Sequence, residues 1–158
     1  FVDKGAGKVD RLLENVGFVL YCESCLNRKL VKEPEETTCD VCGSKMAKVG
    51  PLWLGQLFDE KLVLEALEIS KSMKHLDKEA FKMLSRIAEE ASGPPLYYDL
   101  SKLAKKLKKS SPPIAKVVEE LKSMGFFASR THFRSYAVRT NASIVELEQA
   151  FLSALSDH

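Results

Sequence analysis

The sequence has 158 residues, of which 45% are hydrophobic and 29% are charged. This share of apolar side chains excludes a wholly disordered chain, and the length suits one domain or two small ones. The net charge of +2 hides an asymmetry, because residues 97–140 hold ten Lys and Arg against three Asp and Glu. Such a basic block is typical of a surface that binds a polyanion, although a solvated Lys-rich helix face gives the same signal.

The hydropathy and the first residues of the sequence bear on the cellular location of the protein. No apolar run approaches the roughly 20 residues that a membrane helix needs, and no signal peptide opens the sequence. We therefore expect a soluble, cytoplasmic protein with no membrane segment. The first residue is Phe rather than Met, so we also expect a piece of a longer protein.

Four cysteines stand in two pairs, Cys22-x2-Cys25 and Cys39-x2-Cys42, separated by thirteen residues. This spacing is close to that of a zinc ribbon, in which each pair directs two thiolates at one tetrahedral ion. A strand over residues 17–21 would lead into the first pair, and Gly43 would take a positive φ after the second. Disulfides and a redox pair are the alternatives. With four thiolates, a zinc here would be structural, since no coordination position stays open for substrate.

Helical periodicity marks the segments before and after this cluster. Residues 9–16 predict one or two helical turns that end at Gly17. Apolar residues recur at helical spacing over 59–74 and again over 76–91, and Gly93-Pro94-Pro95 follows. These patterns predict two successive helices in the middle of the chain.

The basic block predicts a different sequence of elements. Asp99 is suited to cap a helix over 100–107, and Ser111 with Pro112 is suited to begin a helix that runs to residue 124. Strands are expected over 126–129 and 136–140. The capping box Ser143-x-x-Glu146 starts a last helix.

Helices followed by a hairpin predict an α+β chain that ends in a winged-helix-like domain. In winged helices the third helix normally lies on the nucleic acid and the wing grips its backbone. The third helix expected here has a nearly neutral exposed face, because Glu119 and Glu120 accompany Lys116 and Lys122. This composition favours recognition of backbone and shape over the reading of base edges.

Three motifs are shared with a known family. They are Gly50-Pro51-Leu52-Trp53-Leu54-Gly55-Gln56-Leu57 directly after the cysteines, Pro94-Pro95-Leu96-Tyr97-Tyr98-Asp99-Leu100, and Ser129-Arg130-Thr131-His132-Phe133 followed by Val138-Arg139-Thr140. In order and spacing they resemble the C-terminal region of the archaeal type of tRNA (guanine-26, N2) dimethyltransferases. The resemblance covers nearly the whole chain.

This resemblance implies an S-adenosylmethionine-dependent enzyme that methylates the exocyclic amine of guanosine 26 in tRNA. The family's Rossmann-like catalytic domain has no counterpart here, so S-adenosylmethionine would bind only outside this chain and the chain alone should be inactive. Its partners would be tRNA and the upstream methyltransferase domain. The expected organisation is a tail of that domain (1–21), a zinc-ribbon-like module (22–57), a helical segment (58–92) and a winged-helix-like, tRNA-binding domain (93–158).

The candidate RNA contacts are basic or aromatic residues of the last domain: Lys105, Lys106, Lys108, Lys109, Arg130, His132, Arg134, Arg139, Tyr97 and Tyr98. The cations would contact phosphate, and Tyr97 and Tyr98 would stack on unpaired bases or pack in the interior. Two other functions stay open on the sequence alone. They are a zinc-ribbon/winged-helix transcription factor that binds DNA and a protein-interaction module.

Overall fold

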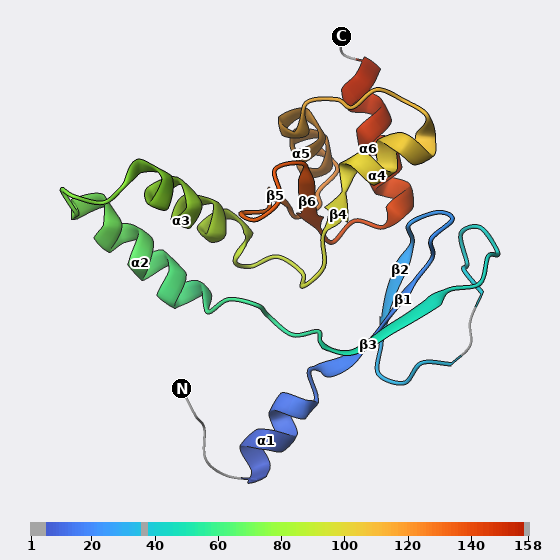
Figure 1. Ribbon diagram of the computed structural model, residues 1–158, viewed down its shortest axis with the longest axis horizontal. Helices are drawn as coiled ribbons and strands as arrows, with labels where there is room; N and C mark the ends of the chain where they lie inside the picture. The colour runs from blue at the N-terminus through green and yellow to red at the C-terminus, as the bar shows by residue number, and fades with distance from the viewer. Residues whose placement is uncertain (1–5, 36–37, 157–158) are drawn as a thin grey trace. The chain divides into compact units, whose positions relative to one another are not determined.

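The computed structural model describes residues 6–35 and 38–156, and the chain forms two compact units (Figure 1). The first unit ends at Gly55 and the second begins at Gln56. The second unit therefore contains both the predicted helical segment and the predicted winged-helix-like domain. Residues 1–5 of the expected upstream tail lie outside the described residues.

The first unit consists of a short helix and a three-stranded antiparallel sheet. Helix α1 (Ala6–Leu13) precedes β1 (Val16–Tyr21), which is the central strand between β2 (Arg28–Val31) and β3 (Ala47–Trp53). The predicted strand at 17–21 is confirmed. Because β1 pairs on both sides with strands that flank the cysteines, the boundary expected after residue 21 falls inside this unit.

Gly17 does not end a helix, as the sequence suggested, but lies within β1. A Cβ at Gly17 would lie 2.6 Å from the carbonyl oxygen of Val31 on the neighbouring strand. Glycine therefore permits a close approach of strands β1 and β2, and the helical turns lie earlier in the chain than predicted.

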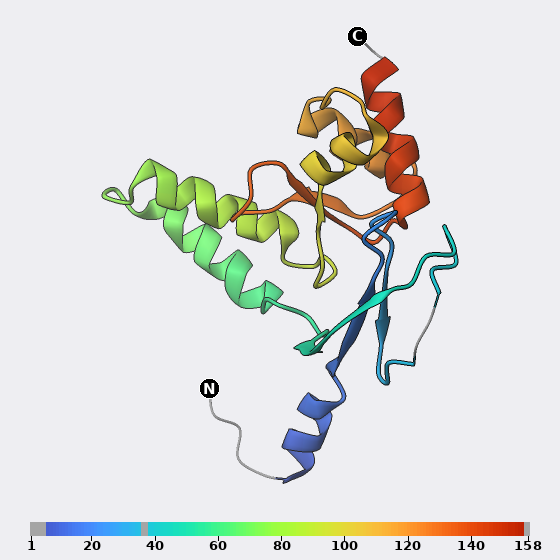
Figure 2. The same ribbon diagram turned by 45° about the vertical axis from the view of Figure 1, so that its right-hand side comes forward.

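The second unit begins with a pair of adjacent helices, α2 (Glu60–Ser72) and α3 (Lys78–Glu90), which lie side by side in both views (Figures 1 and 2). The two predicted middle helices are thus confirmed, with ends shifted by one or two residues. Aspartates cap both: Asp59 accepts from the backbone N–H of Leu62, and Asp77 accepts from Glu79 and Ala80.

The rest of the second unit packs three helices around a small antiparallel sheet of order β4-β6-β5. The elements are β4 (Tyr98–Asp99), α4 (Leu100–Leu107), α5 (Ile114–Ser123), β5 (Ala128–Arg130), β6 (Ala137–Thr140) and α6 (Ile144–Ser156). Helices α5 and α6 pack together, and their inward side chains Val117, Leu121, Leu147 and Phe151 have no exposed surface. This mixture of helix and sheet confirms the α+β class.

Of the three helix starts predicted after residue 97, two are confirmed. The Asp99 carboxylate accepts from the backbone N–H of Ser101, 2.9 Å away. In the capping box, the Ser143 N–H donates to the Glu146 carboxylate at 2.6 Å, and the Glu146 N–H donates to the Ser143 hydroxyl at 3.4 Å.

The predicted start of the third helix is wrong. Helix α5 begins at Ile114 with Pro113 at its N-cap, and no side chain caps it. Pro112 is instead buried in the interior, and its carbonyl oxygen accepts a 2.6 Å hydrogen bond from the Tyr136 hydroxyl. This tertiary contact holds the segment before α5 outside the helix, so Ser111 cannot cap it.

Within the described residues, no helix is long and apolar enough to span a membrane.

Candidate metal centre and nucleic-acid interface

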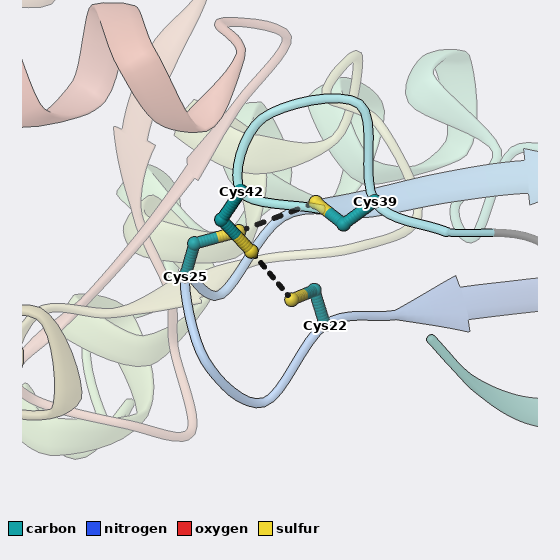
Figure 3. A group of neighbouring side chains, drawn as sticks. All are labelled: Cys22, Cys25, Cys39 and Cys42. Carbon is teal, nitrogen blue, oxygen red and sulfur yellow. Dashed lines mark hydrogen bonds between the residues drawn. The ribbon is translucent and has the colours of Figure 1, made fainter. Parts of the chain in front are cut away.

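The four cysteine sulfurs converge on one point of the first unit (Figure 3). All four lie within 4.8 Å of one another, and the pairs Cys22–Cys42 and Cys25–Cys39 are each separated by 3.4 Å. No disulfide joins them. Four sulfurs bound tetrahedrally at the usual zinc–sulfur distance stand about 3.8 Å apart. The donor set and its spacing therefore fit a single zinc ion.

The two cysteine pairs are held by the same turn, used twice. In the first, the N–H of Leu26 donates to the carbonyl of Cys22, and in the second the N–H of Gly43 donates to the carbonyl of Cys39, both at 2.8 Å. The residue after each pair has a positive φ, 65° at Leu26 and 72° at Gly43. The positive φ expected at Gly43 is confirmed. The matching positive φ at Leu26 could not be predicted from the sequence, because leucine rarely adopts this conformation.

The surroundings of the cysteines make one thiol much more acidic than another. Burial alone raises the pKa of the Cys39 thiol, but hydrogen bonds from the Asn27 amide and from the N–H groups of Val41 and Cys42 outweigh it and lower the pKa to about 6. Burial raises the pKa of Cys25 to about 12, with the Asn27 N–H opposing this effect. A divalent cation would favour the thiolate form at each ligand.

Four of the seven lysines of the basic block lie at the C-terminal end of α4. Lys105, Lys108 and Lys109 are exposed there, and Lys108 caps the helix in a left-handed conformation with φ of 53°. Lys106 is half-buried and forms an ion pair with Glu148 of α6. The structure thus brings three cations to the surface together, while the fourth helps to join two helices.

The predicted arginines of the hairpin differ in their accessibility. Arg130 is half-buried, and Arg134 is exposed with its guanidinium 2.5 Å from the Asp99 carboxylate. Arg139 has only 2% of its surface exposed, and it donates to the Glu90 carboxylate at 2.8 Å and to the Pro94 carbonyl at 2.6 Å. Arg139 is therefore directed to the interior rather than to a phosphate.

Glu90, which the sequence did not single out, is the centre of this interior network. It is fully buried, and besides Arg139 it accepts from the backbone N–H of His132 at 2.9 Å and lies 2.5 Å from His132 Nδ1. Its partners lie 42 and 49 residues further along the chain, so no local pattern could have revealed it. The network ties the end of α3 to the β5–β6 hairpin.

The two tyrosines proposed for base stacking occupy different environments. Tyr98 is only 8% exposed and lies in β4, paired with Val138. Tyr97 is half-buried and meets Phe133 edge to face at 5.0 Å, and Phe133 also meets the ring of His132 at the same distance. Phe133, which the sequence analysis did not select, is 52% exposed. Of these rings it presents the largest exposed aromatic surface.

Comparison with known proteins identifies the family. The family model described as N2,N2-dimethylguanosine tRNA methyltransferase matches residues 1–151. The chain belongs to this family.

Relatives support this assignment over nearly the whole chain. A tRNA (guanine(26)-N(2))-dimethyltransferase of Methanosphaera stadtmanae is 36% identical, over 99% of this chain and 41% of that protein. The tRNA (guanine(26)-N(2)/guanine(27)-N(2))-dimethyltransferase of Aquifex aeolicus is 35% identical, over 92% and 37%. The chain thus spans about two fifths of the length of these relatives.

A solved structure is similar in fold. Trm1 from Pyrococcus horikoshii, in complex with S-adenosyl-L-methionine, superposes with a TM-score of 0.76 and 28% identity, over 94% of this chain and 38% of that one. The resemblance expected from the three motifs is confirmed, and the chain corresponds to a part of the family's full length.

Proposed function

We propose that this chain is the tRNA-binding, C-terminal part of an S-adenosylmethionine-dependent tRNA (guanine-26, N2) dimethyltransferase, and that it positions tRNA for methylation of guanosine 26. The observation that carries the proposal is the group of exposed cations at the end of α4 in a chain of this family. The order of helices and hairpin supports a winged-helix-like domain. Its upstream methyltransferase partner and its cytoplasmic location stay predictions.

The exposed cations suit contacts with phosphate. Lys105, Lys108 and Lys109 lie within five residues of one another, and Arg130 contributes from β5. Arg134 already has Asp99 as a partner, and Arg139 is buried, so we place neither among the main contacts. Each phosphate contact releases condensed counterion, which predicts a slope of log affinity against log salt of roughly −0.7 to −0.9 per contact.

Charge reversal tests where tRNA binds. The variant Lys105→Glu/Lys109→Glu should bind tRNA much more weakly and with a flatter salt dependence, as measured by fluorescence anisotropy. Lys71→Glu/Lys74→Glu is the matched control, because it makes the same change of charge on exposed lysines outside the basic block. Equal losses from both variants would show that only the net charge matters. Preference for duplex DNA over tRNA at equal salt would favour a transcription factor instead.

The four cysteines are proposed to hold one structural zinc ion. Such an ion would join the turn after β1 to the turn before β3 and stabilise the first unit, without taking part in methyl transfer. Metal analysis of the purified chain should find about one zinc per chain. Chelation should lower the melting temperature of the first unit. Trp53 fluorescence can monitor this unfolding, because the single tryptophan of the sequence lies in β3 of that unit. A metal-free chain with unchanged melting would contradict a structural zinc.

S-adenosylmethionine is proposed to bind in the part of the protein upstream of this chain. Calorimetric titration of the chain alone with S-adenosylmethionine should therefore show no specific binding. A low-micromolar affinity would place the cofactor site within these 158 residues and contradict the proposal that S-adenosylmethionine binds upstream of them.

A further inference from the structure

A cavity of about 400 Å³ lies beside α5, on the face of the helix that points away from α6. Ala115, Val118, Glu119 and Lys122 line it, and their spacing along the helix places them on one side. Glu120, the next residue after Glu119, instead accepts a 3.0 Å hydrogen bond from Ser153 of α6. The outward face of α5 therefore forms the wall of a hollow.

The opposite wall comes from other elements. Strand β5 contributes Ser129 and Arg130, and the end of α3 contributes Glu89. Ser129 is 4% exposed, and its hydroxyl has no hydrogen-bond partner within the described part of the chain. That hydroxyl has less than 1 Å² of accessible surface, so it lies behind the wall of the cavity and a ligand there would not contact it.

The charges around the cavity are of both signs. Glu89, Glu119, Lys122 and Arg130 all line it, and within residues 6–35 and 38–156 none of the four forms an ion pair. Two carboxylates and two cations around small apolar side chains suit a ligand that carries both hydrogen-bond donors and negative charge.

The size of the cavity limits what this ligand can be. Small-molecule sites typically occupy about 300–1,000 Å³, so this cavity can hold a single nucleotide. A duplex groove requires an open, protruding helix, whereas here α3 and β5 flank the outward face of α5. An unpaired nucleotide fits this surface better than a double helix does.

The carboxylates select among the bases. An ionised carboxylate only accepts hydrogen bonds, and guanine offers it two adjacent donors, N1–H and the exocyclic amine. The corresponding edges of adenine, cytosine and uracil each have a single donor beside one or two acceptors, so none of them offers two adjacent donors. Lys122 and Arg130 can take the phosphate that accompanies the base.

We propose that this cavity binds one unpaired guanine nucleotide of the RNA, with Glu119 or Glu89 on the edge of the base and Lys122 and Arg130 on the adjoining phosphate. The proposal rests on the proposed tRNA-binding function and adds a base-specific contact to it. It gives the nearly neutral third helix a role in recognition that its charge alone does not predict.

The test compares two short RNAs that differ in one base. Fluorescently labelled UUGUU and UUAUU are titrated with the whole 158-residue chain at fixed salt. The guanine RNA should bind more tightly, by about fivefold or more, which is the discrimination that a paired set of hydrogen bonds provides. Glu89→Gln/Glu119→Gln should bring the ratio of the two affinities close to one. The ratio is the readout, because removing negative charge raises the affinity for any RNA.

Two further variants separate this effect from a general loss of structure. Glu120→Gln is the matched control on the same helix and should keep the guanine preference. Val118→Phe should fill the cavity and remove the preference while the charges stay unchanged. Thermal melting of each variant shows whether it is folded.

The outcomes distinguish this proposal from the proposed function. If the chain binds tRNA but does not distinguish UUGUU from UUAUU, or if the two glutamate variants keep the preference, the guanine site is wrong and the tRNA-binding function stands. If the chain binds neither tRNA nor the short RNAs, both fail. If GMP competes as well as UUGUU does, the ligand is a free guanine nucleotide, and the assignment to RNA is overturned.

Discussion

Replacing Glu90 tests whether a buried charge network holds α3 to the β5–β6 hairpin. In the variant Glu90→Ala, the Arg139 guanidinium would remain in the interior, where it is 2% exposed, with the Pro94 carbonyl as its one remaining partner among the contacts described above. The His132 N–H would also lose its 2.9 Å acceptor. Removing one partner of a buried ion pair costs about 3–5 kcal/mol, because the other charge stays buried and uncompensated.

This cost converts into a large change of melting temperature. The second unit has about 100 residues, for which each kcal/mol shifts the melting temperature by roughly 4 °C. Glu90→Ala should therefore lower it by roughly 12–20 °C. Circular dichroism at 222 nm is a suitable signal, because five of the six described helices, α2 to α6, lie in the second unit.

The same helix provides a matched control. Glu79 of α3 forms an exposed ion pair with Lys82, in which both side chains are more than half exposed. Exposed pairs contribute little to stability, so Glu79→Ala should leave the melting temperature nearly unchanged. A second check is the double variant Glu90→Leu/Arg139→Leu, which removes both charges and should melt above Glu90→Ala. If Glu90→Ala melts like Glu79→Ala, the network does not stabilise the unit and the reasoning is refuted.

Three further predictions concern local structure. Gly43→Ala should destabilise the first unit by about 1 kcal/mol, because φ is positive there; no atom lies within 4 Å of the added Cβ, so the cost comes from the backbone conformation and not from a clash. Gly7→Ala in helix α1 should instead stabilise the unit slightly, and equal effects of the two variants in chemical unfolding would contradict this reasoning. Ser143→Ala removes the cap of α6 and should cost about 1 kcal/mol in the same assay, and no change would show that the capping box is not needed. A hydrogen bond from Lys29 lowers the pKa of Asp40, so the ionised Asp40 carboxylate stabilises the fold at pH values above the pKa of a free aspartate, and this stabilisation is lost as the pH falls through the pKa of Asp40 in the folded chain. Lys29→Met should raise the Asp40 pKa in an NMR titration, and an unchanged pKa would exclude Lys29 as the cause.

Features that depend on short stretches of chain could be predicted from the sequence. The spacing of Cys22, Cys25, Cys39 and Cys42 indicated a common site, since two residues between cysteines suffice to direct both sulfurs at one point. Asp99 and the box formed by Ser143 and Glu146 act within three residues, so their hydrogen bonds follow from local geometry. The three motifs identified the family for the same reason, because each is a continuous run of residues.

Features that depend on distant partners were decided only by the tertiary structure. Arg139 is part of a basic segment, yet Glu90, 49 residues before it, draws it into the interior. The Tyr136 hydroxyl holds Pro112 out of helix α5, although Ser111 and Pro112 together have the composition of a helix start. In both cases a contact between residues far apart in the chain outweighs a local preference, because a buried polar group must find its partner wherever the fold places it.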